Sequence, residues 1–439
     1  MTEQTLEQLT LDGLRILVAG DTVAIRGTAK LEPAGGPGDK IFPPSHSVDE
    51  KKPRAGAKYA SEKRRIDGRD VDCVLVDSVQ SQANRMEEAL QTLWADKRIS
   101  LPVISVDFAT IAPDVGLVTS LSAPHRVADA LLRDSLSDGT FFRLSKVGMS
   151  FSDATAKNAG PLFTVCPTGL IFGLWDSTGP KGGLGSKFAR ALVSEIVGVG
   201  AVFGTKTASR IDPTGIVTAS GVLYIKSRAE GEPVTWTLAP EEAQKDGNEP
   251  LKWGSKKGKD GKWKQGSGKP SEANHSNIPP TIDELAGGVT VDYALHTVVL
   301  SLAAIRKLSF GTGDAEARKA ADLAARTVLA ALGLLAVLAA ESRGHDLRSR
   351  CLLVPKQEEG KNNALRLETV GRDGKTGQLA LDLDGAIKLF NQAVDKLPEA
   401  LRFPAKGVPL VTLTPSPKLA HLVTKSRELA AVGADVEAD

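Results

Sequence analysis

The residues best suited to bind an anion lie between positions 176 and 190, in the segment DSTGPKGGLGSKFAR. Four glycines fall within seven residues of it, and glycine lets backbone N–H groups approach a phosphate closely. We expect a strand over 168–175 and a helix over 186–198, so that a helix N-terminus adds its dipole and Arg190 follows Lys187 by one turn. The candidate phosphate ligands are Lys181, Gly182, Gly183, Gly185, Ser186, Lys187 and Arg190.

This glycine-rich segment differs from the common nucleotide-binding loops. It fits neither G-x-x-x-x-G-K-[ST] nor G-x-G-x-x-G, which argues against a standard nucleotide-hydrolysing site. A flexible turn that needs glycine for its geometry explains the spacing equally well. A nucleotide-binding enzyme that uses these glycines stays open as an alternative.

Two other segments carry polar residues that suit phosphate or sugar oxygens. The segment TKTASR supplies Lys206, Ser209 and Arg210, although a solvated strand end explains it as well. A helix expected over 78–95 carries amides and a cation near its N-terminus, although an ordinary polar helix face is at least as good an explanation. The candidates from this helix are Gln80, Gln82, Asn84 and Arg85.

Positive charge is concentrated in short runs. Residues 50–65 hold seven cations, among them Arg64 and Arg65, against two acids. Residues 245–270 hold eight lysines against three acids, with Trp253 and Trp263 between them. Lysine interleaved with aromatic residues is typical of surfaces that follow the backbone of single-stranded nucleic acid and stack its bases. A soluble loop is the simpler interpretation of each run.

These runs also explain the near-zero net charge. The chain has 439 residues, 55 Lys and Arg, and 53 Asp and Glu, for a formal charge of +2. The two runs each carry +5 and residues 180–210 carry +4, so the rest of the chain carries −12. We therefore expect the basic stretches to converge on one groove, with an acidic remainder that limits non-specific association with nucleic acid.

Catalytic and metal-binding patterns are sparse. The six histidines are scattered, and no H-E-x-x-H, G-x-S-x-G or Cys-His spacing occurs. His125 beside Arg126 is the one candidate acid–base pair, although packing at a helix start is the simpler explanation. We therefore expect no catalytic set, no metal and no cofactor. Three isolated cysteines, Cys73, Cys166 and Cys351, indicate reduced thiols.

Hydrophobic periodicity predicts interleaved strands and helices. An apolar strand over 71–76 leads into the helix over 78–95, capped by Asp77 or Ser78, and this step looks like half of a βαβ unit. The buried face of that helix is predicted to hold Val79, Ala83, Met86, Leu90 and Leu93. Further strands are expected over 14–31, 103–108, 221–227, 288–302 and 351–354, and further helices over 124–135, 315–341 and 382–397.

The pattern predicts an α+β fold with one polar insertion. Residues 1–227 and 282–439 would form the core with helical additions, and 228–281, rich in Lys, Gly and Trp, a hairpin or mobile loop. The most apolar stretch, 328–340, has 13 residues, and about 18 or more are needed to span a bilayer. With no signal-peptide pattern at the N-terminus, we expect a cytoplasmic protein without a membrane partner.

Six segments together resemble one protein family. They are KIFPP at 40–44, KYASEKRRIDG at 58–68, VLVDSVQSQANRMEEAL at 74–90, TSLSAPHRVADALLRDS at 119–135, FGLWDSTGPKGGLGSKFARALVSEIVG at 172–198 and KTASRIDPTGI at 206–216. The chain resembles the CRISPR-associated RAMP backbone subunits of type I-U (I-G) systems, the Csb family of Cas-seven-like proteins. The resemblance covers most of residues 14–310.

The resemblance implies a ferredoxin-like (RRM-type) RAMP core with large insertions and a helical C-terminal part. It implies a non-catalytic subunit that polymerises along CRISPR RNA, with a protruding hairpin that wedges between bases. The implied partners are CRISPR RNA, the target DNA strand through guide pairing, further copies of the chain and other effector subunits. The open alternatives are a RAMP-type endoribonuclease that uses His125 on precursor CRISPR RNA, and a scaffold that binds only protein.

Overall fold

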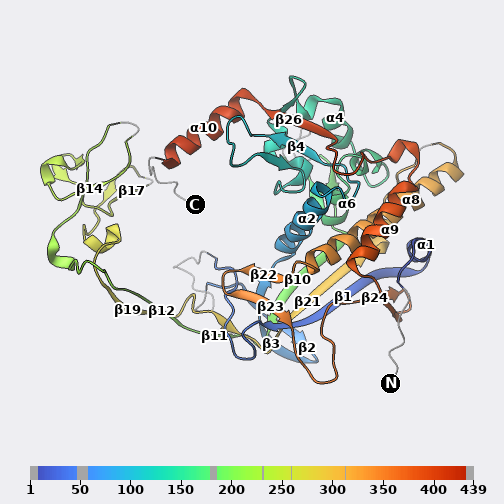
Figure 1. Cartoon of the computed structure of the whole chain (residues 1–439), viewed down its shortest axis with the longest axis horizontal. Helices are drawn as coiled ribbons and strands as arrows, with labels where there is room; N and C mark the ends of the chain where they lie inside the picture. Colours follow the sequence, from blue (N-terminus) through green and yellow to red (C-terminus); the bar gives the residue numbers. More distant parts are fainter. Residues whose placement is uncertain are drawn as a thin grey trace. The chain divides into compact units, whose positions relative to one another are not determined.

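The chain divides into two compact units. The computed structural model describes residues 8–46, 58–177, 185–229, 232–258, 260–311 and 313–431. Unit 1 comprises Met1–Gly204 and Gly288–Leu419, and unit 2 comprises Thr205–Gly287 and Ala420–Asp439 (Figure 1). Unit 2 thus begins at Thr205, whereas the sequence pattern places the start of the polar insertion at residue 228. The fold is α+β, as the sequence predicts.

Unit 1 is built on a nine-stranded antiparallel sheet. Seven strands form a continuous path: β2 (Ser61–Ile66), β3 (Arg69–Asp77), β10 (Leu192–Val199), β21 (Tyr293–Ser301), β1 (Thr22–Pro33), β23 (Cys351–Pro355) and β22 (His345–Arg348). β24 (Arg366–Gly371) pairs with the first part of β1, and β25 (Thr376–Leu379) pairs with β24. β10 and β21 are neighbours in this sheet, and unit 2 is inserted between them in the chain.

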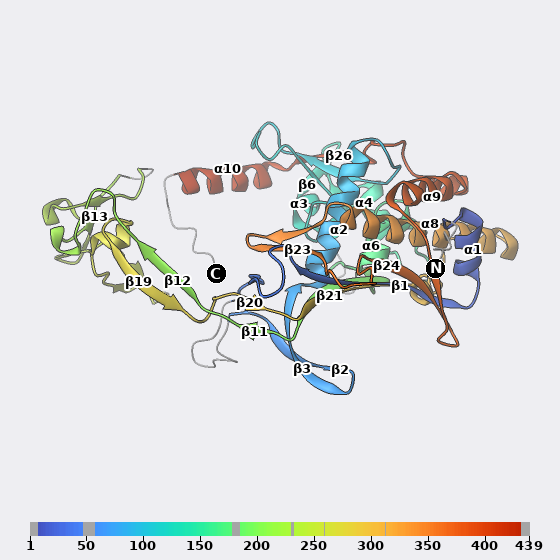
Figure 2. The same cartoon turned by 60° about the horizontal axis from the view of Figure 1, so that its bottom comes forward.

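Four helices of unit 1 pack around its sheet. They are α1 (Leu11–Ala19), α2 (Val79–Ala95), α8 (Ala315–Glu341) and α9 (Leu383–Asp395). α8 contacts α1, α2, α9 and β21, and two views show α2, α8 and α9 on one side of the sheet (Figures 1 and 2). A Cβ at Gly333 would lie 2.8 Å from the Cδ1 of Leu300, so glycine permits the close approach of α8 to β21.

The predicted helix over 315–341 is confirmed as α8. Its length and composition would allow it to cross a membrane, but 72% of its most apolar 18-residue window is buried inside the protein. Core helices of soluble proteins pass the same test of length and composition. The burial is that of a core helix, as expected for its apolar stretch over 328–340.

Several other predicted elements are confirmed. Ser78 caps α2 by accepting a hydrogen bond from the amide of Ser81, and Ala83, Met86, Leu90 and Leu93 are buried. β4 (Ile104–Asp107), β21, β23 and α9 also lie where the sequence predicts them. β4 belongs to a second sheet with β5 (Leu117–Thr119), β26 (Val411–Pro415), β6 (Ser135–Ser137) and β7 (Thr140–Phe141). The half βαβ unit is therefore wrong, because the strand that follows α2 enters a different sheet from β3.

Three elements before residue 176 differ from the sequence prediction. Residues 14–19 belong to α1 rather than to a strand, because Leu14 and Val18, four residues apart, bury one helix face. Residues 168–172 form α6 (Thr168–Phe172), and only β8 (Leu174–Trp175) is a strand. The helix expected over 124–135 is interrupted at Asp129, whose extended backbone ends a 3₁₀ turn and caps the short α3 (Ala130–Arg133).

The most consequential correction concerns the residues after the glycine-rich segment. The expected helix over 186–198 is instead β9 (Lys187–Phe188) followed by β10. Val193, Ile196, Val197 and Val199 are β-branched and favour a strand that pairs with β3 and β21 on its two sides. Consequently the helix expected over 186–198 cannot add its dipole, and Arg190 does not lie one helical turn from Lys187.

Unit 2 is a series of short two-stranded ribbons. Its stem pairs β12 (Lys206–Arg210) with β19 (Ile278–Asp283) (Figure 1). Beyond the stem, three ribbons follow: β13 (Tyr224–Ile225) with β14 (Trp236–Thr237), β15 (Lys245–Asp246) with β16 (Glu249–Pro250), and β17 (Lys256–Lys257) with β18 (Trp263–Lys264). The strand expected over 221–227 is thus reduced to the two residues of β13.

Candidate nucleic-acid interface

A cavity of about 680 Å³ in unit 1 collects several of the predicted binding residues. Its walls come from the start of α2, from the turn before the 3₁₀ segment Arg126–Ala128, and from the β8–β9 hairpin. The polar side chains on these walls are Gln80, Asn84, His125, Arg126, Ser177, Lys187 and Arg190. No Asp or Glu lines the cavity among the described residues, so the electrostatic field there favours an anion.

The β8–β9 hairpin carries the ends of the glycine-rich segment into this cavity. Trp175 is paired with Lys187, and the amide of Asp176 donates to the carbonyl of Ser186 at 3.0 Å. Asp176 forms a buried ion pair with Arg143. The hydroxyl of Ser186 donates to the carbonyl of Phe151 at 2.6 Å, so this residue fixes the hairpin. Residues 178–184, including the predicted ligands Lys181, Gly182 and Gly183, lie outside the described residues.

Arg190 is a half-buried cation that has no partner among the described residues. Its guanidinium forms no hydrogen bond or ion pair with any residue that the structure describes. Desolvation by burial lowers the pKa of Arg190, the like charge of Arg126 adds to that shift, and Glu87 opposes it. Gly173 has a φ of +88°, and a Cβ there would lie 2.9 Å from the Cγ of Arg190. Glycine at 173 therefore makes room for a guanidinium whose donors are free to bind a ligand.

Arg126 connects the elements that form the wall of the cavity near Arg190. Its guanidinium donates to both carboxylate oxygens of the buried Glu87, at 2.7 and 2.8 Å, and to the carbonyl of Gly173 at 3.2 Å. It also lies over the ring of Phe172, 5.4 Å from the centroid. Burial raises the pKa of Glu87 to about 7, although the charge of Arg126 opposes that shift. This pair is a structural support, and the free charge of the cavity comes from Lys187 and Arg190.

An exposed indole lies at the mouth of the cavity. The Nζ of Lys187 is 5.2 Å from the ring centroid of Trp175, whose side chain is 58% exposed. An aromatic ring beside a lysine can stack a base while the ammonium group contacts a phosphate. The side chains of Gln80, Asn84 and His125 form no hydrogen bonds within the described parts of the chain, so their donors also face the cavity unpaired.

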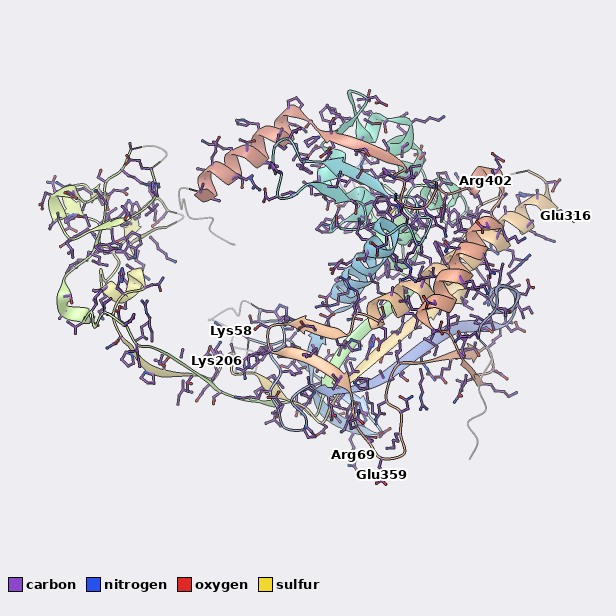
Figure 3. The ribbon with its side chains drawn as sticks, viewed as in Figure 1. Lys58, Arg69, Lys206, Glu316, Glu359 and Arg402 are labelled. Carbon is purple, nitrogen blue, oxygen red and sulfur yellow. The ribbon has the colours of Figure 1, made fainter. Side chains whose placement is uncertain are left out.

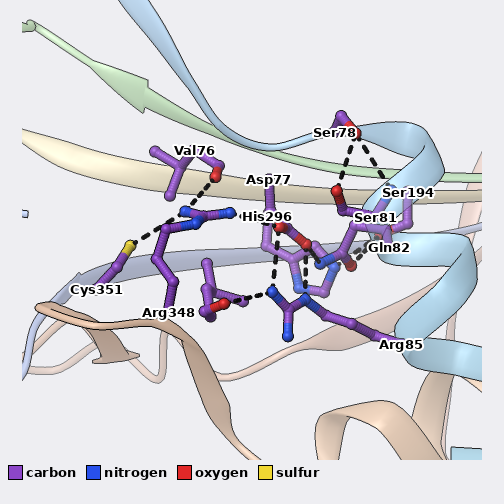
Figure 4. Close-up of polar contacts among 11 residues, drawn as sticks. Val76, Asp77, Ser78, Ser81, Gln82, Arg85, Ser194, His296, Arg348 and Cys351 are labelled. Carbon is purple, nitrogen blue, oxygen red and sulfur yellow. Dashed lines mark hydrogen bonds and ion pairs between the residues drawn. The ribbon is translucent and has the colours of Figure 1, made fainter. Parts of the chain in front are cut away.

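Four predicted binding residues of unit 1 lie elsewhere, in structural contacts. Gln82 is buried and donates to Asp77 at 2.7 Å, and Arg85 donates to the same carboxylate at 3.0 Å (Figure 4). Arg64 is paired with Glu195 at 2.7 Å, and its pKa is raised mainly by that hydrogen bond. Arg65 is paired with Asp70 at 3.1 Å.

The expected convergence of the basic runs on one groove stays a prediction, and within each unit several of their cations are paired. In the first run, acids on β2, β3 and β10 neutralise the described arginines, and charged side chains such as Arg69, Glu316 and Glu359 of both signs extend from the surface of unit 1 (Figure 3). Lys206, Ser209 and Arg210 lie in unit 2, where Lys206 pairs with Asp283 at 3.3 Å. In the second run, the indole N–H of Trp253 donates to the carbonyl of Glu272.

Sequence reasoning missed Trp175 and the placement of His125. Trp175 is the last residue before the glycine-rich segment, and its pairing with Lys187 appears only once 174–188 is recognised as a hairpin. Of the predicted ligands, the structure brings Gln80, Asn84, Lys187 and Arg190 together in the cavity, with Gly185 and Ser186 in the adjoining hairpin.

Unit 1 is thus an α+β framework with a cationic cavity beside an exposed tryptophan, and no described Asp or Glu lines that cavity. Residues 25–202 match the family model described as CRISPR-associated protein GSU0053. The matched range includes every residue that lines the cavity. No curated protein matches the chain. The family match supports a CRISPR-associated protein.

Proposed function

We propose that the chain is a non-catalytic, guide-RNA-binding backbone subunit of a type I CRISPR interference complex. The observation that carries this proposal is a cavity in which, among the described residues, Lys187 and Arg190 form no ion pair and no Asp or Glu lines the walls. The match of residues 25–202 to a CRISPR-associated family supports RNA as the anion.

The proposed mechanism assigns one role to each group. Arg190 donates to phosphate oxygens in the planar geometry that guanidinium groups offer, and Lys187 adds a mobile positive charge. Trp175 stacks a base, and Asn84 donates its amide to sugar or phosphate. Since none of these contacts requires a particular base, binding is sequence-tolerant and weakens as salt rises.

The connectivity of the main sheet supports the proposed RAMP core. β1, α2, β10, β21, α8 and β23 occur in this order along the chain, with other elements between them, and their strands lie in the sheet in the order β10, β21, β1, β23. A strand–helix–strand–strand–helix–strand unit with all neighbours antiparallel is typical of ferredoxin-like folds. Unit 2, inserted between β10 and β21, is then our candidate for the protruding hairpin. The proposed setting is a cytoplasmic filament of several copies with CRISPR RNA, other effector subunits and paired target DNA.

The test is the affinity of the full chain for a labelled single-stranded RNA. We expect the Lys187→Ala/Arg190→Ala variant to bind more weakly than the wild type. The matched control is Arg372→Ala/Lys375→Ala, which removes two exposed cations that pair with Asp21 and Asp373 away from the cavity. Equal binding by the wild type and the cavity variant would refute the proposal.

One observation favours a second candidate function, a RAMP-type endoribonuclease. The exposed His125 lines the same cavity as Lys187 and Arg190, where a scissile phosphate would bind. Incubation with repeat RNA in the absence of metal distinguishes the two functions. A product that the wild type forms and the His125→Ala variant does not form would establish the nuclease.

A further inference from the structure

Three metal-ligating side chains meet in unit 1, away from the proposed RNA site. They are His296 on β21, Glu341 at the end of α8 and His345 at the start of β22. One ligand atom from each lies within 4.8 Å of the other two. The three residues line a separate cavity of about 250 Å³.

A chain of hydrogen bonds fixes which nitrogen of His296 carries its proton. The carboxylate of Asp77 accepts from the amide nitrogen of Gln82 at 2.7 Å, which directs the amide oxygen of Gln82 towards Ser194 (Figure 4). The hydroxyl of Ser194 donates to that oxygen at 2.9 Å. Its single proton is thereby used, so the Nε2 of His296, 2.9 Å away, must donate to Ser194.

The Nδ1 of His296 is consequently unprotonated, and its lone pair lies in the interior of the protein. His296 is 3% exposed, and its Nδ1 has no hydrogen-bond partner among the described residues. A carboxylate oxygen of Glu341 lies 3.6 Å from this nitrogen. Two acceptors that face each other in a buried place repel unless a cation lies between them.

His345 completes a set of ligands. Its Nε2 lies 3.2 Å from the other carboxylate oxygen of Glu341, and the two imidazole centroids are 5.4 Å apart. Tetrahedral zinc with bonds of about 2.0–2.1 Å separates neighbouring ligand atoms by about 3.4 Å. The separations from Glu341, 3.6 Å to one carboxylate oxygen and 3.2 Å to the other, lie close to that value. In the tautomer of His345 that carries its proton on Nδ1, the Nε2 supplies the second nitrogen lone pair for a metal ion.

The charges around this cavity leave the carboxylate of Glu341 available. Arg85 and Arg343 line the cavity, but they are paired with Asp77 and Glu88 respectively. We propose that His296, Glu341 and His345 form a binding site for a zinc-class divalent metal ion, with the fourth position open to a water molecule in the cavity. The Asp77–Gln82–Ser194 chain acts as the outer shell that orients a metal-binding histidine. Such an ion would join the end of α8 and the start of β22 to β21.

Titration of the EDTA-treated full chain with cobalt(II), followed by visible absorption, tests this site. We expect one equivalent to bind with the absorption of a four- or five-coordinate ion, and zinc to displace it. Ser194→Ala keeps all three ligands but removes the hydrogen bond that fixes the tautomer of His296. Loss of such a partner of a metal-binding histidine typically weakens metal binding 10- to 100-fold. His345→Gln should abolish binding, whereas the control His421→Gln, an exposed histidine, should bind as the wild type does.

The outcomes separate the metal site from a purely structural cluster. Wild-type protein that binds no stoichiometric cobalt, or His345→Gln protein that binds it as tightly as the wild type, overturns the proposal. If His345→Gln does not fold, Glu341→Gln, which preserves side-chain shape, takes its place. Cobalt binding by Glu341→Gln that is as tight as in the wild type then overturns the proposal. A melting temperature that rises with zinc in the wild type but not in Glu341→Gln supports the site.

Discussion

Removing the two free cations of the cavity should change how RNA binding depends on salt. On single-stranded nucleic acid, each phosphate contact adds about −0.7 to the slope of log K against log salt. If Lys187 and Arg190 each hold one phosphate, Lys187→Ala/Arg190→Ala makes the slope about 1.4 less steep. Over a fourfold rise in salt, the wild type then loses about 7-fold more affinity than the variant.

Fluorescence anisotropy with a labelled RNA at several salt concentrations measures this slope. The Arg372→Ala/Lys375→Ala control loses the same net charge, so a general electrostatic effect would change both variants alike. Its slope should match that of the wild type. An unchanged slope in the cavity variant, or the same change in the control, would refute the assignment of phosphate contacts to Lys187 and Arg190.

Three other perturbations test the walls of the cavity. Trp175→Ala should weaken RNA binding by about 1–3 kcal/mol with no change in salt slope, because a stacking contact carries no charge. Gly173→Ala should lower the free energy of unfolding by about 1–3 kcal/mol in denaturant titrations, since φ of +88° and ψ of 152° suit only glycine. Between pH 4.5 and about 7, the folded state keeps the proton of Glu87 that the unfolded state releases, so stability falls as pH rises. Glu87→Gln removes this contribution and makes that decline shallower by up to about 1.4 kcal/mol per pH unit.

Each of these predictions has its own opposite outcome. A Trp175→Ala variant with wild-type affinity would remove stacking from the mechanism, and Trp175→Phe, which keeps a ring, should retain most of the binding. A Gly173→Ala protein as stable as the wild type would show that the strain is relieved elsewhere. Identical pH profiles of stability for the wild type and Glu87→Gln would show that Glu87 stays ionised in the fold.

The long periodic elements of the chain could be predicted from its sequence. α8 and α2 each carry a sustained apolar face, and Ser78 marks the start of α2 with a cap that needs only local residues. The region 168–198 could not be predicted in this way. Its short apolar runs suit either helix or strand, and the choice depends on the sheet neighbours of β10, which come from distant parts of the chain.

The sequence indicates which residue types could form the candidate site, but it does not show how the fold places them. Lys187 and Arg190 stood out because they flank glycines, yet the hairpin that places Trp175 beside Lys187 depends on tertiary structure. Gln82 and Arg85 have polar side chains that suit a ligand, and only the fold shows that the buried Asp77 binds both. His296 is far from Glu341 and His345 in the chain, so no spacing pattern reveals their cluster.

Ultraviolet cross-linking of RNA to the full chain, followed by mass spectrometry of the linked peptides, tests the central claim most directly. The account predicts cross-links within residues 173–190, at Trp175 above all, and their loss in the Lys187→Ala/Arg190→Ala variant. Cross-links confined to other parts of the chain, with none between 173 and 190, would contradict it.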